Sequence, residues 1–130
     1  MQYQFDFGAL LPYWRDFLSG ALMTVEITLF SVIIGMGIGV ACAIGRRSDS
    51  AILRSIVSVY IETVRNTPFI VQIFFIFFGL SSIGFRLPIL AASVFAMVIN
   101  VGAYTAEIVR AGMDSIHPSQ IEAAEALGLS

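Results

Sequence analysis

Cysteine, histidine and lysine are nearly missing from this chain of 130 residues, which has one cysteine (Cys42), one histidine (His117) and no lysine. A single cysteine excludes a disulfide within the chain and a metal site built from cysteines. These counts also leave no nucleophile–base pair or metal set for an intramembrane enzyme, so we expect no catalytic residues and no cofactor in this chain. The seven basic residues are outnumbered by nine acidic ones, which argues against a nucleic-acid partner.

Charge of either sign is scarce, and long apolar stretches take its place. Charged residues make up 12% and hydrophobic residues 58% of the chain, whereas a soluble domain has about 25% and 45–50%. A membrane helix needs roughly 20 mostly apolar residues. Three predicted spans meet this length, at about residues 20–44, 55–80 and 87–109. We therefore expect an all-α, multi-pass domain over residues 20–109, in contact with membrane lipid.

The first 19 residues differ from a cleavable signal peptide because they lack a basic start and an uninterrupted apolar core. Their aromatic and apolar side chains instead favour a segment at the membrane interface, where Trp and Tyr are enriched. These side chains are Phe5, Phe7, Leu10, Leu11, Tyr13, Trp14 and Phe17.

Arginine placement predicts the orientation of the spans. The connection 45–54 has three arginines, whereas the connection 81–87 has only Arg86. Basic residues favour the cytoplasmic side. The N-terminal segment 1–19 is therefore expected outside, and the tail 110–130, which begins with Arg110, in the cytoplasm.

Small residues form one helical face in the first span, at steps of three and four positions. Such faces let helices pack closely in lipid, and Gly35 and Gly39 form a GxxxG pair. Packing is the favoured interpretation, and a permeation path lined by hydroxyls is the alternative. The face consists of Thr24, Thr28, Ser31, Gly35, Gly39 and Cys42.

The second span is interrupted by polar residues and a proline. Pro68 lacks an N–H group and clashes with the carbonyl of Val64, which predicts a helix break. Glu62 and Arg65 are three residues apart, so they can pair on one face. Gln72 is expected on the same side as Arg65. A broken helix with polar groups is typical of a transporter's substrate site, whereas a structural ion pair beside a proline kink is the alternative.

The third span also has a polar face, formed by Ser93, Met97, Asn100, Tyr104 and Glu107. Polar groups in a membrane helix usually face the bundle interior or a wet cavity. Interhelical hydrogen bonding and substrate lining are equally open interpretations for Asn100 and Tyr104.

The tail predicts a short helix. Ser119 and Glu122 have the spacing of a capping box. Residues 120–127 favour a helix, and Gly128 is a good helix stop. Because so short a helix is not stable alone in water, we expect it to dock on a partner through a small apolar face of Ile121, Ala124 and Leu127 or Gly128.

Three motifs together resemble permease subunits of bacterial ABC importers of the polar amino acid family. Residues 121–128 read Ile-Glu-Ala-Ala-Glu-Ala-Leu-Gly, like the EAA loop of these permeases. Residues 60–68 (Tyr-Ile-Glu-Thr-Val-Arg-Asn-Thr-Pro) and 102–110 (Gly-Ala-Tyr-Thr-Ala-Glu-Ile-Val-Arg) resemble two further segments of that family.

The resemblance implies a fold of five membrane helices, of which this chain matches the first three and the start of the EAA-type loop. It implies an amino acid importer in the plasma (inner) membrane, with ATP hydrolysed in cytoplasmic ABC ATPase subunits. A second permease subunit, identical or related, and an extracytoplasmic amino-acid-binding protein would be further partners. By the match, the ATPase-coupling residues are Glu122, Ala123, Ala124 and Gly128.

The substrate path is a hypothesis from the residues themselves, because a polar zwitterion needs a cationic group and hydrogen-bond partners in a low-dielectric site. The path would comprise Arg65, Asn66, Thr67, Gln72, Asn100, Tyr104 and Glu107, beside the break at Pro68. Two alternatives remain: a truncated permease fragment, and a small membrane channel or anchor without ATP-coupled transport. The sequence does not specify which amino acid is transported.

Overall fold

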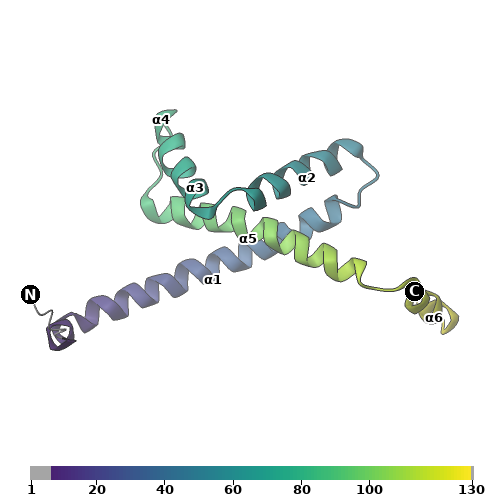
Figure 1. Ribbon diagram of the computed structural model, residues 1–130, viewed down its shortest axis with the longest axis horizontal. Helices are drawn as coiled ribbons and strands as arrows, with labels where there is room; N and C mark the ends of the chain where they lie inside the picture. Colours follow the sequence, from purple (N-terminus) through teal and green to yellow (C-terminus); the bar gives the residue numbers. More distant parts are fainter. Residues whose placement is uncertain (1–6, 130) are drawn as a thin grey trace, which may run out of the picture.

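The computed structural model describes residues 7–129, and this part of the chain is all helical (Figure 1). Residues 1–6 and 130 lie outside the described residues, so the interfacial role predicted for Phe5 does too. The helices are a 3-10 helix (Phe7–Tyr13), α1 (Trp14–Gly45), α2 (Ala51–Asn66), α3 (Phe69–Phe74), a π-helical turn (Phe75–Gly79), α4 (Leu80–Ser82), α5 (Ile89–Asp114) and α6 (Pro118–Ala126).

Two helices are long and apolar enough to cross a membrane, and a bent pair could make a third crossing. The stretch from Leu10 through α1 and the whole of α5 qualify on their own. Helix α2 and the continuous stretch Phe69–Ser82 meet at a bend of 110°. The chain is therefore an all-helical protein with two or three candidate spans. Helix α1 begins six residues before the predicted first span, and α5 continues five residues past the predicted third one.

Helices α1 and α5 cross at close range because glycines face each other there. A Cβ atom built on Gly35 would lie 2.7 Å from Val101 Cγ1, and one on Gly39 would lie 2.8 Å from the Gly102 carbonyl oxygen. Ser31, one turn earlier, is fully buried. The packing interpretation of the small face is confirmed for this half of α1. Thr24 and Thr28 are exposed, and each hydroxyl bonds a carbonyl of its own helix.

The two long helices run in the same direction. Gly35 lies against Val101, Gly39 against Thr105, and Arg46 against Glu107, so positions increase together along both helices. The C-terminal ends of α1 and α5 consequently lie at the same end of the molecule. The chain between them has to return to the other end, which α2 and α3 accomplish on one flank of the crossing (Figure 1).

Helix α2 is held on α5 by a small core and one side-chain hydrogen bond. Val57 and Ile61 are buried against Ala106. The Tyr60 hydroxyl donates to the Ile99 carbonyl oxygen at 2.7 Å. Polar residues of α2 recur at steps of four, four and three, and this stripe comprises Arg54, Ser58, Glu62 and Arg65.

Candidate transport and coupling sites

The break between α2 and α3 lies at the predicted proline. Helix α2 ends at Asn66, Thr67 is extended (φ −106°, ψ 126°), and α3 begins directly after Pro68. In an unbroken helix the N–H of residue 68 would bond the Val64 carbonyl, but proline has no such group. The prediction of a helix break is confirmed.

Gln72 supplies the donor that Pro68 lacks. Its side-chain nitrogen donates to the carbonyl oxygens of Val64 and Thr67, both at 2.8 Å. Its side-chain oxygen accepts from Asn100 Nδ2 at 3.3 Å. Gln72 is only 9% exposed, so these bonds satisfy groups that are shielded from solvent. The amide therefore ties both sides of the break to α5.

A cluster of charges joins the ends of α1, α2 and α5. The Glu107 carboxylate is paired with Arg46 at 3.0 Å, with Arg65 at 3.2 Å and with Arg110. Asp114 extends the cluster through Arg47 and Arg110. The Glu107 side chain is 19% exposed, so its negative charge is compensated from three helices rather than by water.

The predicted pair between Glu62 and Arg65 is wrong. Glu62 lies 3.4 Å from Arg46, and Arg65 pairs with Glu107 instead. The reason is tertiary: the polar stripe of α2 faces charged residues of α1 and α5. Spacing within one helix gives no information about such partners.

Six of the seven predicted path residues make side-chain contacts near the break, in two separate groups of three. Gln72 connects the backbone of Thr67 to Asn100. Arg65 contacts Glu107 and also lies over the Tyr104 ring, with its guanidinium carbon 5.8 Å from the ring centre. Asn66 is exposed and makes no side-chain hydrogen bond in the described structure.

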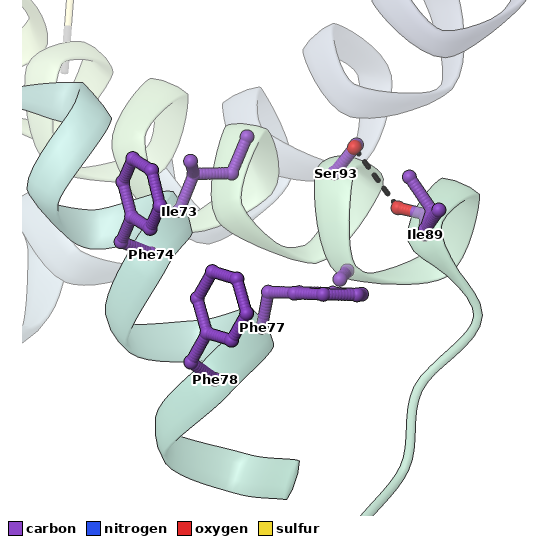
Figure 2. Close-up of a pocket in the computed structure, with 7 residues that line it drawn as sticks. Ile73, Phe74, Phe77, Phe78, Ile89 and Ser93 are labelled. Carbon is purple, nitrogen blue, oxygen red and sulfur yellow. Dashed lines mark hydrogen bonds between the residues drawn. The ribbon is translucent and has the colours of Figure 1, made fainter.

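Two mostly apolar cavities flank the broken helix. The larger one, of about 480 Å³, lies in the angle between α2, α3 and α5, and two predicted path residues, Thr67 and Gln72, line it. The smaller one, of about 210 Å³, lies between α3 with its π-helical turn and the start of α5. Figure 2 shows Phe74, Phe77 and Phe78 facing this second cavity, with Ser93 bonded to the carbonyl of Ile89.

Helix α6 lies beyond the end of α5 and away from the α1–α5 crossing (Figure 1). Its N-cap is His117, whose Nδ1 accepts from the Ser119 N–H, while the Gln120 side chain accepts from the His117 N–H. The predicted capping box of Ser119 and Glu122 is wrong. Pro118 occupies the first helical position, which proline favours, and this signal marks the earlier start.

The predicted helix stop is confirmed. Gly128 has φ +74°, and the N–H groups of Gly128 and Leu129 donate to the carbonyls of Glu125 and Ala124. This arrangement is a Schellman motif, which needs a residue that tolerates positive φ. A cavity of about 310 Å³ lies along α6 and includes Ile121 and Ala124 of the predicted docking face.

The coupling residues predicted for α6 are accessible. Glu122 and Ala123 are exposed, Ala124 is half-buried and lines the α6 cavity, and Gly128 ends the helix. Since His117 and Gln120 cap the helix, the Glu122 carboxylate takes no part in the cap.

Sequence reasoning missed several residues of the charged cluster. Arg46 and Asp114 lie in the predicted connection 45–54 and the predicted tail 110–130, yet both form ion pairs with residues of other segments. A usable signal was the concentration of arginines and carboxylates where two apolar stretches end.

Comparison with known proteins identifies relatives over nearly the whole chain. Residues 34–130 match the family described as "Binding-protein-dependent transport system inner membrane component". A probable amino-acid ABC transporter permease protein of Sinorhizobium fredii is 38% identical, covering 95% of this chain and 56% of the relative. The glutamine transport system permease protein of Escherichia coli is 38% identical, with coverages of 98% and 59%. The arginine transport system permease protein of Bacillus subtilis is 35% identical, with coverages of 95% and 57%.

A solved structure has the same fold. The crystal structure of an amino acid ABC transporter with histidines matches with a TM-score of 0.91 and 38% identity. The match covers 98% of this chain and 60% of that chain. The chain thus spans between half and two thirds of the length of these relatives.

Proposed function

Since the chain belongs to the family of inner membrane components of binding-protein-dependent transport systems, we propose that it forms part of a permease subunit that imports a polar amino acid. Relatives named for glutamine and arginine transport support this substrate class. A separate cytoplasmic ABC ATPase hydrolyses ATP, a second permease subunit completes the membrane pathway, and an extracytoplasmic binding protein delivers the amino acid.

The observation that carries this proposal is the exposed helix α6. Helix α6 contains the EAA-like residues and follows the C-terminal end of α5, where the charged cluster lies. An apolar cavity lies along α6. A nine-residue helix needs a docking partner to be stable in water. Glu122, Ala123, Ala124 and Gly128 meet the ATPase, and the free Glu122 carboxylate pairs with a basic group on it.

The same geometry suggests how ATPase closure reaches the membrane. Helix α6 follows α5 after three residues, and α5 contains Glu107, which pairs with Arg65 near the end of α2. Arg65 is three residues before Pro68, where the helix breaks. A displacement of α6 is therefore transmitted through α5 and Glu107 to the break. There it changes the angle between α2 and the stretch Phe69–Ser82.

The chain is proposed to cross the membrane three times, as the first three helices of a five-helix core. The support is the parallel direction of α1 and α5, because two parallel crossings need one return crossing between them. The bent pair α2 and Phe69–Ser82 makes that return. Arginine placement then puts the N-terminal segment 1–19 outside and the loop 110–130 in the cytoplasm.

The substrate path is proposed to run over the break, past Arg65, Asn66, Thr67, Gln72, Asn100, Tyr104 and Glu107. Arg65 offers a cation, and the exposed Asn66 amide has free hydrogen-bonding groups. Within this set Gln72 is a positioning residue, because its amide groups bond the backbone and Asn100.

Capture of the partner from native membranes tests the coupling proposal. The chain with an affinity tag is expected to bring down an ABC ATPase identified by mass spectrometry. Glu122→Ala should reduce this capture at least fivefold, because it removes the charged contact. Glu125→Ala is the matched control on the same helix and should keep it. Capture that is equal for both variants, or no ATPase with the parent chain, would overturn the proposal.

Uptake of radiolabelled amino acid by the assembled transporter tests the path. Asn100→Leu is expected to lower uptake at least tenfold, because it removes an amide from a low-dielectric site, while ATPase capture stays unchanged. Ser93→Ala, whose hydroxyl bonds only its own helix, serves as the control on α5. Normal uptake by the Asn100 variant would remove this residue from the path.

A further inference from the structure

A pocket rich in arginine lies where α1 ends, beside the start of α2 and the end of α5. It encloses about 340 Å³, a volume in the range of small-ligand sites. Four arginines and a single carboxylate line it, together with one hydroxyl. The lining residues are Arg46, Arg47, Arg54, Ser58, Arg110 and Asp114. The transport proposal gives this pocket no role.

The cations of this arginine pocket are only partly neutralised. Arg46 pairs with Glu62 and shares Glu107 with Arg110, and Arg47 shares Asp114 with Arg110. Arg54 donates to the Ser48 carbonyl oxygen at 3.1 Å and pairs with no carboxylate within residues 7–129. Each guanidinium has five N–H donors, so Arg47 and Arg54 retain donors for an anion.

The chemistry of the pocket favours a phosphate group. Arginine forms charge-assisted, often bidentate bonds with phosphate oxygens. Arginines from the turn after α1, from α2 and from α5 surround one space, so they can bind one anion together. A zwitterionic headgroup would bring its own cation next to them, which is unfavourable.

The position of the pocket favours a phosphate that belongs to a lipid. The apolar run of α1 ends at Ile44, one residue before Gly45 and the arginines. Ile44, Ile52 and Ile56 are exposed apolar side chains on α1 and α2 beside the pocket. In the proposed orientation this is the cytoplasmic leaflet, and basic pockets between membrane helices on that side bind anionic headgroups.

We propose that the arginine pocket binds the phosphate of an anionic phospholipid, with the acyl chains along the exposed apolar side chains of α1 and α2. Free inorganic phosphate offers the same group without those chains. The site rests on the proposed orientation and is independent of the transported amino acid.

Lipid binding to the purified full chain, followed by native mass spectrometry in detergent, tests this site. Phosphatidylglycerol is expected to bind at least ten times more tightly than phosphatidylcholine. Each arginine near a charged lipid surface contributes on the order of a fivefold gain in affinity. The double variant Arg47→Gln/Arg54→Gln should therefore lower phosphatidylglycerol affinity about 25-fold and leave phosphatidylcholine binding unchanged.

Two further variants distinguish a loss of binding at the arginine pocket from a loss caused by reduced overall charge or by misfolding. Arg15→Gln/Arg86→Gln removes the same number of exposed cations outside the pocket and should keep phosphatidylglycerol affinity within twofold. Arg54→Gln alone breaks no ion pair and should still cost about fivefold. Equal affinity for the two lipids, equal losses in both double variants, or unchanged binding by Arg54→Gln would overturn the site. Displacement of phosphatidylglycerol by millimolar inorganic phosphate would overturn its assignment to lipid.

Discussion

Gln72 links a local defect of the backbone to the rest of the protein. Pro68 removes the helical donor of the Val64 carbonyl, which keeps only a long bond of 3.4 Å from the Thr67 N–H. A poorly paired carbonyl is costly where water is excluded. The Gln72 amide reaches back across the break to this oxygen and to the Thr67 carbonyl, while Asn100 fixes the amide from α5. The Gln72 side chain therefore stabilises the angle between α2 and the stretch Phe69–Ser82.

Replacing Gln72 by Glu keeps its size and removes both N–H donors. We expect a loss of about 1–3 kcal/mol in stability, because the Val64 and Thr67 carbonyls lose their bonds to the Gln72 amide and face a carboxylate. The measurement is the denaturation midpoint of the purified chain in detergent, followed by circular dichroism. Asn66→Asp makes the same exchange at an exposed position without a side-chain bond and should change the midpoint little. Equal midpoints for the two variants would contradict the bridging role.

Close packing of α1 on α5 belongs to the scale of elements. A face of small residues lets the backbones of these helices approach each other. Gly35 and Gly39 lie at the crossing, whereas a Cβ added to Gly37 would meet no atom within 4 Å beyond its chain neighbours and the backbone of its own helix. The chain thus provides matched glycines two residues apart on opposite faces of one helix.

Gly39→Ala is expected to push α1 away from α5, since its Cβ would lie 2.5 Å from Thr105 Cβ. Overpacking of this kind costs about 1–3 kcal/mol. Gly37→Ala adds the same methyl group on the open face and should be neutral or slightly stabilising. Thermal unfolding of both variants in detergent checks this. A Gly39 variant as stable as the Gly37 variant would show that the crossing is not tight.

The parallel direction of α1 and α5 depends on the charged cluster and on the bent pair of α2 and Phe69–Ser82 together. Glu107 holds the ends of α1 and α5 at one end of the molecule through Arg46. The segment between them must then begin at that end and finish at the other. A re-entrant loop would instead return the chain to its starting side and make α5 run against α1.

Labelling of single cysteines with a membrane-impermeant maleimide tests this topology in a Cys42→Ser background. Phe85→Cys is expected to react in intact spheroplasts, because the proposed orientation places the connection before α5 outside. Ser48→Cys and Ser115→Cys should react only after permeabilisation, since both follow helices that end inside in the proposed orientation. Labelling of positions 48 and 85 from the same side would establish a re-entrant loop.

Features with a local cause could be predicted from the sequence. The apolar stretches, the break at Pro68 and the stop at Gly128 follow from composition and from backbone sterics within a few residues. The EAA-like segment and its helix belong to the same group. The start of α6 also has a local signal, because proline favours the first helical position, but the predicted start rested on the spacing of Ser119 and Glu122 alone.

The sequence by itself therefore determined that this is a membrane protein, where its apolar helices lie, where one of them breaks and which family it resembles. Only the tertiary structure decided the partners: Glu62 with Arg46, Arg65 with Glu107, and Gln72 with the carbonyls at the break. The physical reason is that helical periodicity specifies which residues share a face. The partner of that face depends on how the helices pack, and here the glycines of α1 bring α5 within reach.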